Sequence, residues 1–196
     1  MARPRLSEGT RVRLLEASVS AFLEHGYHGT GLKRVLDRVD VPKGSFYNYF
    51  ASKEELGVAV IQHYAARSAE DLTDALDGAP DPLTGLRTFF QRQIRDFVAA
   101  EYAGGCLLAN LAGELDGSEA SRLALATAFR EWRDGVRDAL EEAQRLGSVR
   151  GDVEATELAD MLIEAWEGAV IRMKIDQTVA PLERCLERLL DGYFRP

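Results

Sequence analysis

Apolar residues recur three and four positions apart along most of this chain, and this spacing is typical of helices that each bury one face. Breaks in the pattern fall at glycines and prolines, which end helices or open loops. The segments with this spacing lie at about 7–25, 30–39, 42–50, 52–76, 83–101, 106–112, 118–146, 153–175 and 181–193. The sequence therefore predicts about nine helices in its 196 residues.

Two of these segments are short and separated by only a few residues. Segment 30–39 has Leu32, Val35, Leu36 and Val39 on one face, with Thr30 placed to cap its start. The residues between the two segments favour a tight turn, because Asp40 tolerates the left-handed conformation, and Pro42 is acceptable at or just before a first helical position. The pattern predicts a helix-turn-helix.

The second short helix has the composition of a recognition helix. Phe46 and Phe50 are expected to anchor it, because most aromatic residues at helical spacing are core residues. The remaining side chains are polar or aromatic with hydroxyls, and Lys43 and Ser45 are the candidates for reading base edges. Lys53 follows just past the helix, where it is expected to hold a phosphate.

The sequence Val41-Pro42-Lys43-Gly44-Ser45-Phe46-Tyr47-Asn48-Tyr49-Phe50, with Gly26-Tyr27 and Ser52-Lys53-Glu54-Glu55-Leu56 around it, closely resembles the TetR family of bacterial transcriptional regulators. The resemblance is strong over residues 8–60. It implies an all-α protein with an N-terminal three-helix DNA-binding domain over residues 1–52 and a larger helical domain over residues 53–196. The second domain would bind a ligand and dimerise, with helix 53–76 as the connector.

The same resemblance implies which side chains meet double-stranded DNA. Tyr47 and Tyr49 are expected to bond phosphates, with the Tyr47 ring near a thymine methyl, while Gly44 lets the duplex approach closely. Thr30 has two interpretations, as a helix cap only or as a cap that also meets a phosphate. The expected DNA-binding residues are Thr30, Lys33, Lys43, Gly44, Ser45, Tyr47, Asn48, Tyr49 and Lys53. Arg3 and Arg5, ahead of the first helix, form either a minor-groove arm or a solvated tail.

The net charge of −8 is divided unevenly along the chain. Residues 1–67 have ten Lys and Arg against seven Asp and Glu, whereas residues 68–196 have 14 against 25. A basic N-terminal part attached to an acidic remainder favours an oriented contact with DNA over indiscriminate coating of it.

Cys106 follows Ala103-Gly104-Gly105 and precedes a helix, a position that favours thiolate. It is either a sensor of electrophiles or oxidants, or a small buried hydrophobe. The Gly105-Cys106-Leu107 motif, with Lys174-Ile175 and Pro181-Leu182-Glu183, resembles the TetR subgroup that includes repressors responsive to N-ethylmaleimide and to acrylate. Lys174 or Arg172 would stabilise the thiolate if either folds near it. Trp166 is expected in the ligand cavity or in a packed interface.

The last two predicted helices have small residues that favour close packing, at Ala165, Gly168 and Ala169. In TetR-like proteins the corresponding pair forms a four-helix bundle with its symmetry mate, so the resemblance implies a homodimer. Cys185 is then core or interface.

The leading hypothesis is a dimeric regulator, more specifically a repressor, released from a palindromic operator by a small-molecule or electrophile inducer. The alternative is a TetR-like regulator with a structural Cys106 and a purely non-covalent inducer. An enzyme is the second class, but catalytic and phosphate-binding motifs are lacking. Glu114, Glu164 and Glu167 could do acid–base work, although on helices this acidic they are more simply solvated or ligand-facing. An architectural DNA-binding protein is the third. No metal or cofactor is expected, because the cysteines and histidines lack metal-site spacing. The sequence also predicts a cytoplasmic protein without a membrane segment.

Overall fold

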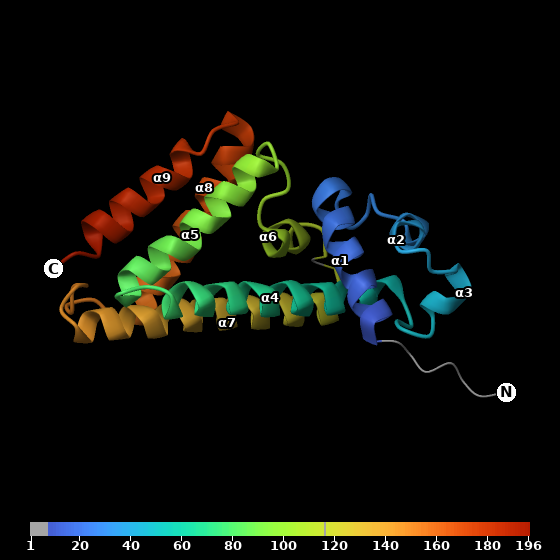
Figure 1. Cartoon of the computed structure of the whole chain (residues 1–196), viewed down its shortest axis with the longest axis horizontal. Helices are drawn as coiled ribbons and strands as arrows, with labels where there is room; N and C mark the ends of the chain where they lie inside the picture. Colours follow the sequence, from blue (N-terminus) through green and yellow to red (C-terminus); the bar gives the residue numbers. More distant parts are fainter. Residues whose placement is uncertain (1–7, 116) are drawn as a thin grey trace. The chain divides into compact units, whose positions relative to one another are not determined.

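The computed structural model describes residues 8–115 and 117–196, and the N-terminal arm with Arg3 and Arg5 lies outside this range. All regular elements in the described residues are helices (Figure 1). In chain order they are α1 Glu8–His25, α2 Leu32–Arg38, α3 Lys43–Phe46, α4 Lys53–Asp77, α5 Pro82–Ala99, α6 Leu107–Ala112, α7 Glu119–Arg145, α8 Ala155–Asp176, α9 Ala180–Leu186 and the π-helical η1 Glu187–Tyr193. The all-α prediction is confirmed, and the helix expected at 181–193 ends in a wide π turn.

Serine side chains cap the starts of α4 and α7. The Ser52 hydroxyl accepts a hydrogen bond from the Glu55 N–H at 3.0 Å, and the Glu55 carboxylate accepts one from the Ala51 N–H at 2.6 Å. Ser118 caps α7 in the same way, accepting from the Ser121 N–H at 3.1 Å. Side-chain oxygens that satisfy free N–H groups in a first turn stabilise helices by about 1 kcal/mol each.

Thr30 does not cap α2, which corrects one expectation. Gly31 occupies the N-cap position of α2 without a side-chain cap. The buried Thr30 hydroxyl instead lies 2.7 Å from the Gly26 carbonyl and 3.0 Å from the Ala21 carbonyl, both near the end of α1. The loop after α1 brings Thr30 back over that end, so α1 offers it acceptors that the sequence pattern does not show.

Replacing Thr30 by valine should therefore lower the free energy of unfolding by about 1–2 kcal/mol, because the buried carbonyls lose a donor. Thr73→Val is the matched control, since the Thr73 hydroxyl bonds the Ala69 carbonyl on an exposed face of α4. Urea unfolding of both variants checks this. Equal stability of Thr30→Val and wild type would contradict the role of the hydroxyl.

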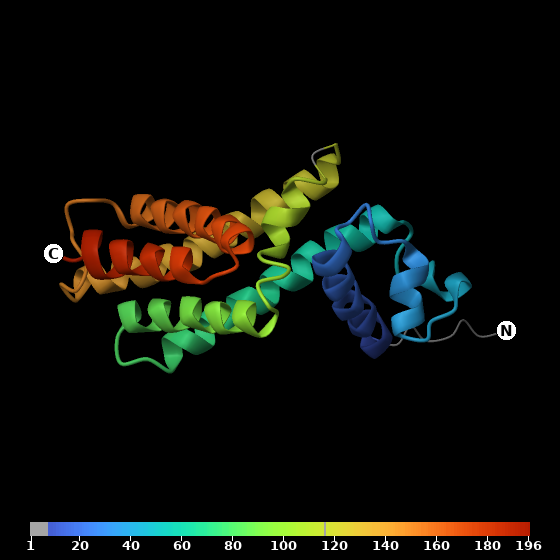
Figure 2. The same ribbon diagram turned by 90° about the horizontal axis from the view of Figure 1, so that it is seen from above.

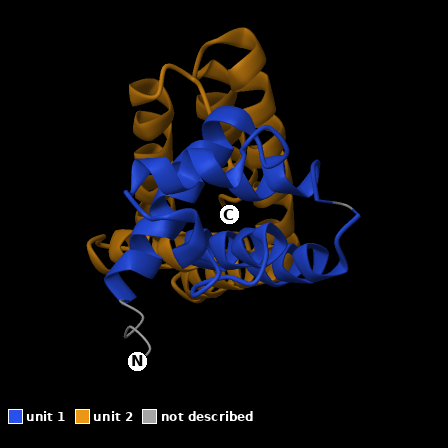
Figure 3. Cartoon of the chain, turned by 90° about the vertical axis from the view of Figure 1, so that its right-hand side faces the viewer, with its two compact units in different colours: residues 1–65, 107–128 blue, residues 66–106, 129–196 orange. Residues whose placement is uncertain are grey.

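The chain forms two compact units, coloured separately in Figure 3. Unit 1 comprises residues 1–65 and 107–128, and unit 2 comprises residues 66–106 and 129–196. Helices α4 and α7 each begin in unit 1 and end in unit 2. The functional boundary between residues 52 and 53 remains a prediction, and the compact units differ from it in placing α6 with the N-terminal helices.

Each unit has its own apolar core. In unit 1, Leu14, Phe22, Phe46, Phe50 and Leu56 are almost completely buried. In unit 2, α8 packs against α9, and both views show the two helices side by side (Figures 1 and 2). The unit 2 core includes the aromatic pair Phe90 and Trp166, with ring centroids 4.6 Å apart.

No described helix has the combination of length and apolar character that crossing a membrane would require.

Candidate functional site

The helix-turn-helix lies in unit 1 and has the geometry that the sequence predicts. Helix α2 is followed by Asp40 with φ of 51°, the expected left-handed turn residue, and Pro42 is the N-cap of α3. The regular part of α3 is a single turn, but hydrogen bonds from the N–H groups of Asn48, Tyr49 and Phe50 continue helical turns beyond it. The recognition segment therefore extends to Phe50.

The aromatic residues of this segment divide between core and surface. Phe46 and Phe50 are buried, with ring centroids 5.8 Å apart. Tyr47 is 57% exposed, an unusual degree for a large aromatic side chain. Lys43, Gly44 and Asn48 are exposed with it, while Ser45 and Tyr49 are half-buried. The exposed side chains of this segment form the recognition surface.

Nothing within the protein requires glycine at position 44. Its φ is not in the left-handed region, and a Cβ added there would meet no atom within 4 Å. Because neither backbone conformation nor protein packing requires it, close approach of a partner is a consistent explanation.

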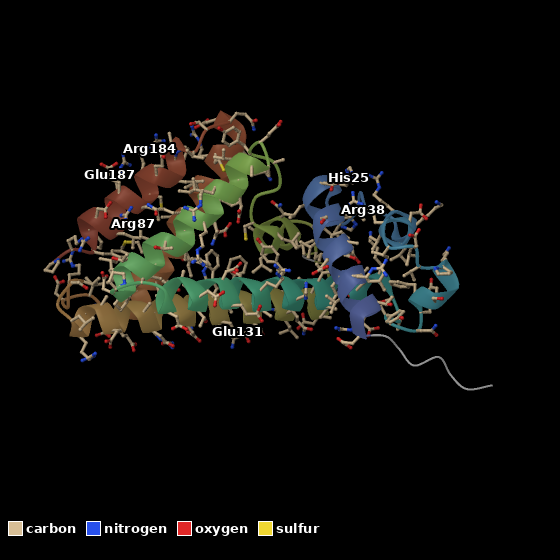
Figure 4. The ribbon with its side chains drawn as sticks, in the orientation of Figure 1. His25, Arg38, Arg87, Glu131, Arg184 and Glu187 are labelled. Carbon is tan, nitrogen blue, oxygen red and sulfur yellow. The ribbon has the colours of Figure 1, made fainter. Side chains whose placement is uncertain are left out.

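Contacts between α1 and α2 fix the position of this surface. The Arg38 guanidinium on α2 bonds the Glu24 carboxylate on α1 at 2.6 Å, and that ion pair lowers the pKa of Glu24. The Arg13 guanidinium on α1 donates to the Val39 carbonyl at 2.7 Å. Figure 4 shows Arg38 near His25, at the end of α1.

Two of the lysines predicted to contact DNA have intramolecular partners in the structure. The Lys33 ammonium is 2.5 Å from the Asp37 carboxylate on the exposed side of α2. The Lys53 ammonium donates to the Tyr27 carbonyl at 2.6 Å and lies 4.1 Å from the centre of the Tyr27 ring. Burial lowers the pKa of Lys53, and the nearby Glu114 carboxylate offsets part of that shift. Their contacts with DNA remain predictions, as does that of Thr30.

The surroundings of Cys106 are built by one face of α8, within unit 2. Gly105 has φ of 87°, and a Cβ there would lie 3.2 Å from the side chains of Val170 and Lys174. Cys106 is half-buried. The Glu167 carboxylate oxygens are buried and, apart from the Cys106 thiol, lack a hydrogen-bond partner among the described residues.

Burial raises the pKa of the Glu167 carboxyl, and the hydrogen bond with Cys106 offsets part of that shift. A carboxylate that has lost water without gaining donors is a stronger base than a solvated one. Glu167 is therefore suited to accept a proton from the neighbouring thiol. Its position with Val170 and Lys174, three and seven residues further on, follows helical phase.

The other two predicted ligand residues lie apart from this cluster. Arg172 is on the exposed side of α8, where its guanidinium bonds Asp176 at 2.8 Å. Trp166 is completely buried against Phe90, and its Nε1–H has no partner among the described residues. Of the two predicted cations, Lys174 is the one beside the Gly105-Cys106 turn. Ligand roles for all four residues remain predictions.

Two of the three carboxylates that the sequence offered as acids, or as solvated or ligand-facing groups, have specific positions in the structure. Glu167 borders Cys106, and Glu114 bonds the loop between α1 and α2. Glu167 lies seven residues before Lys174, on the same face of the predicted helix, and this spacing could have indicated that both lie near Cys106. No local signal indicates Glu114, because its partners lie 86 and 87 residues away in sequence.

A helix-turn-helix in one compact helical unit, in a chain that forms a second helical unit, is the arrangement of a helix-turn-helix transcriptional regulator. Residues 14–60 match the family model described as bacterial regulatory proteins, tetR family, and residues 82–189 match the tetracyclin repressor-like C-terminal domain. The chain belongs to the TetR family of regulators, which are not enzymes.

Characterised relatives match almost the whole chain. It is 35% identical to the transcriptional repressor DhaR of Mycobacterium sp. (strain GP1), over 90% of this chain and 88% of DhaR. It is 33% identical to the regulator AcuR of Cereibacter sphaeroides, over 86% of this chain and 78% of AcuR. It is 32% identical to the repressor NemR of Escherichia coli (strain K12), over 90% of each.

Solved structures agree with the fold. The reduced form of E. coli NemR superposes with a TM-score of 0.88 at 30% identity, covering 96% of this chain and 99% of that one. A regulatory protein TetR from Rhodobacter sphaeroides gives a TM-score of 0.87 at 30% identity, covering 94% and 98%.

Proposed function

We propose that this regulator is a dimeric repressor that binds a palindromic operator and is released by a small-molecule inducer acting in unit 2. The recognition surface of α3 is the observation that supports DNA reading most strongly. There Tyr47 and Lys43 are exposed, while Phe46 and Phe50 hold the segment in the core. Repression follows the relatives DhaR and NemR, which are both named repressors.

The α8 helix supports a dimer. Its exposed face has an apolar stripe formed by Ala165, Gly168, Ile171 and Ile175, and the last two are 57% and 68% exposed. A Cβ at Gly168 would meet nothing within 4 Å, so another helix has room to approach closely. Figure 4 labels the charged side chains of Arg184 on α9 and Glu187 at the start of η1, and both are exposed and suited to pair across a two-fold axis.

Cys106 is the proposed sensor, and α,β-unsaturated carbonyl compounds are the proposed inducer class. The Cys106 sulfur would bond the β-carbon as the carbon–carbon π bond breaks. The Glu167 carboxylate would take the thiol proton and return it to the α-carbon, so no oxidant or leaving group is needed. Lys174 beside the turn would stabilise the thiolate. Resemblance to NemR and AcuR supports this assignment.

A non-covalent inducer is the second candidate. The Trp166 Nε1–H is a buried donor and the Glu167 carboxylate a buried acceptor, and neither has a full set of partners among the described residues. Such groups favour a ligand that supplies the missing hydrogen bonds. Cys106 would then be structural.

Selection from random DNA duplexes tests the dimeric repressor. The enriched site should be an inverted repeat with half-site centres about 34–36 Å apart, bound by two chains in sedimentation. The Ile171→Glu, Ile175→Glu double variant should sediment as a monomer and bind the site more weakly, because charges would be buried at the interface.

The matched control is Leu123→Glu, since Leu123 is exposed on α7 in unit 1. This variant should remain dimeric. An enriched site without symmetry, or a double variant that stays dimeric, would contradict the proposed assembly.

A further inference from the structure

A carboxylate from the segment after α6 is held by the loop between α1 and α2. The Tyr27 N–H donates to Glu114 Oε1 at 3.0 Å, and the His28 N–H donates to Glu114 Oε2 at 2.8 Å. His28 Nε2 lies 2.9 Å from the Glu114 carbonyl oxygen. Three contacts thus join Glu114 to a loop distant in sequence, all within unit 1.

The loop is shaped for this carboxylate. Gly26 has φ of 71°, and successive N–H groups after such a residue form an anion-binding concavity. A Cβ at Gly26 would lie only 2.6 Å from Glu114 Oε1, so the approach also requires glycine. Conformation and space at Gly26 therefore both fit the bound carboxylate.

The same loop is tied to the start of α4. Lys53, in the first turn of α4, bonds the Tyr27 carbonyl, and the Ser118 hydroxyl donates to the Glu54 carboxylate at 2.5 Å. Glu114 thus contacts the α1–α2 loop, and Ser118 contacts the first turn of α4. The α1–α2 loop and α4 flank α2 and α3 in sequence. A displacement of Glu114 and Ser118 would therefore move both elements that support the recognition surface.

Glu114 is linked to Cys106 by one short rigid element. Helix α6 begins at the residue after Cys106, and its Leu107, Leu108 and Leu111 are buried. Helix α6 packs against α1. A helix of six residues is about 9 Å long and moves as a rod, so a shift at its first residue reaches its end.

We infer that Glu114 is the positioning residue that couples Cys106 to the helix-turn-helix, through its bonds to the Tyr27 and His28 N–H groups. A group added at Cys106 displaces α6, and Glu114 then leaves the loop, which shifts α1 relative to α2. The inference rests on the proposed function for its role in induction. The coupling itself depends on unit 1 and on the peptide link between Cys106 and α6.

Hydrogen exchange measures this coupling without DNA. Labelling of Cys106 with N-ethylmaleimide, verified by mass, should speed amide exchange in a peptide spanning residues 26–30 by about fivefold or more in wild type. In Glu114→Ala the same peptide should exchange fast already and show no response to the label. In Glu114→Gln, which keeps one acceptor and the side-chain shape, the response should be intermediate.

Glu119→Ala is the matched control, because the exposed Glu119 carboxylate pairs with Arg122, three residues further along α7. It should respond as wild type does. If the reagent fails to label Cys106, Cys106→Phe supplies the added bulk, and the same comparison applies with and without Glu114→Ala.

The affinity for the selected operator separates this inference from the proposed function. Labelled wild type should bind at least about tenfold more weakly than unlabelled, and Glu114→Ala should reduce that ratio to below about twofold. If labelling speeds exchange in residues 26–30 of wild type but leaves operator affinity constant, covalent induction is contradicted and the coupling stands. An unresponsive wild-type loop, or a Glu114→Ala loop that responds fully, would overturn the coupling.

Discussion

Replacing Lys43 or Tyr47 by alanine should weaken binding to the selected operator by about 10- to 100-fold, while the dimer remains folded. Each good contact to a base edge contributes about 1–3 kcal/mol of discrimination, and phosphate contacts add to affinity without specificity. Both side chains are exposed on the recognition segment, Lys43 in α3 and Tyr47 just after it, so their removal leaves no cavity and no unpaired buried group. Fluorescence anisotropy against the operator, with thermal unfolding of each variant, measures both effects.

Two variants serve as controls for this result. Arg145→Ala removes an exposed cation from α7 in unit 2 and should leave operator affinity unchanged. Phe46→Ala should instead lose stability by about 3–5 kcal/mol, because Phe46 is fully buried. Undiminished operator binding by Lys43→Ala and Tyr47→Ala would mean that α3 does not read DNA.

Substituting Cys106 by serine should abolish the response of the repressor to N-ethylmaleimide. Wild type should lose at least about tenfold in operator affinity on labelling, whereas Cys106→Ser should stay bound with unchanged affinity. The physical reason is that the hydroxyl of serine is a far weaker nucleophile than a cysteine thiolate. A mobility shift with and without the reagent measures the release.

Cys185 is the internal control for thiol chemistry. It is buried in the unit 2 core, and burial raises its pKa to about 11, so almost no thiolate exists near neutral pH. Cys185→Ala should therefore be released by the reagent exactly as wild type is. Release of Cys106→Ser would place the reactive group elsewhere. A lack of release in both proteins would favour the non-covalent inducer.

The helix-turn-helix could be predicted from sequence because its signals are local. Apolar spacing in α2, the left-handed Asp40 and the Pro42 cap all act within a few residues, and the structure has each of them. The separation of buried Phe46 from exposed Tyr47 was also predicted, since only one face of a short helix can reach the core.

Contacts between distant segments could not be predicted in the same way. Thr30 was expected to cap α2, but the fold brings acceptors from α1 to its hydroxyl. Glu114 meets Tyr27 only because α6 packs on α1, and Glu167 borders Cys106 only because α8 lies against the turn at Gly105. Such pairings depend on tertiary packing, for which helical periodicity contains no information.

The central claim is that this chain binds a specific DNA sequence and releases it when an inducer binds. The most direct measurement is the wild-type affinity for the selected operator and for an unrelated duplex, at one salt concentration, before and after labelling with N-ethylmaleimide. We expect the operator to bind at least about a thousandfold more tightly than the unrelated duplex, and labelling to remove most of that preference. Equal affinity for the two duplexes before labelling would contradict sequence-specific regulation and favour an architectural DNA-binding protein.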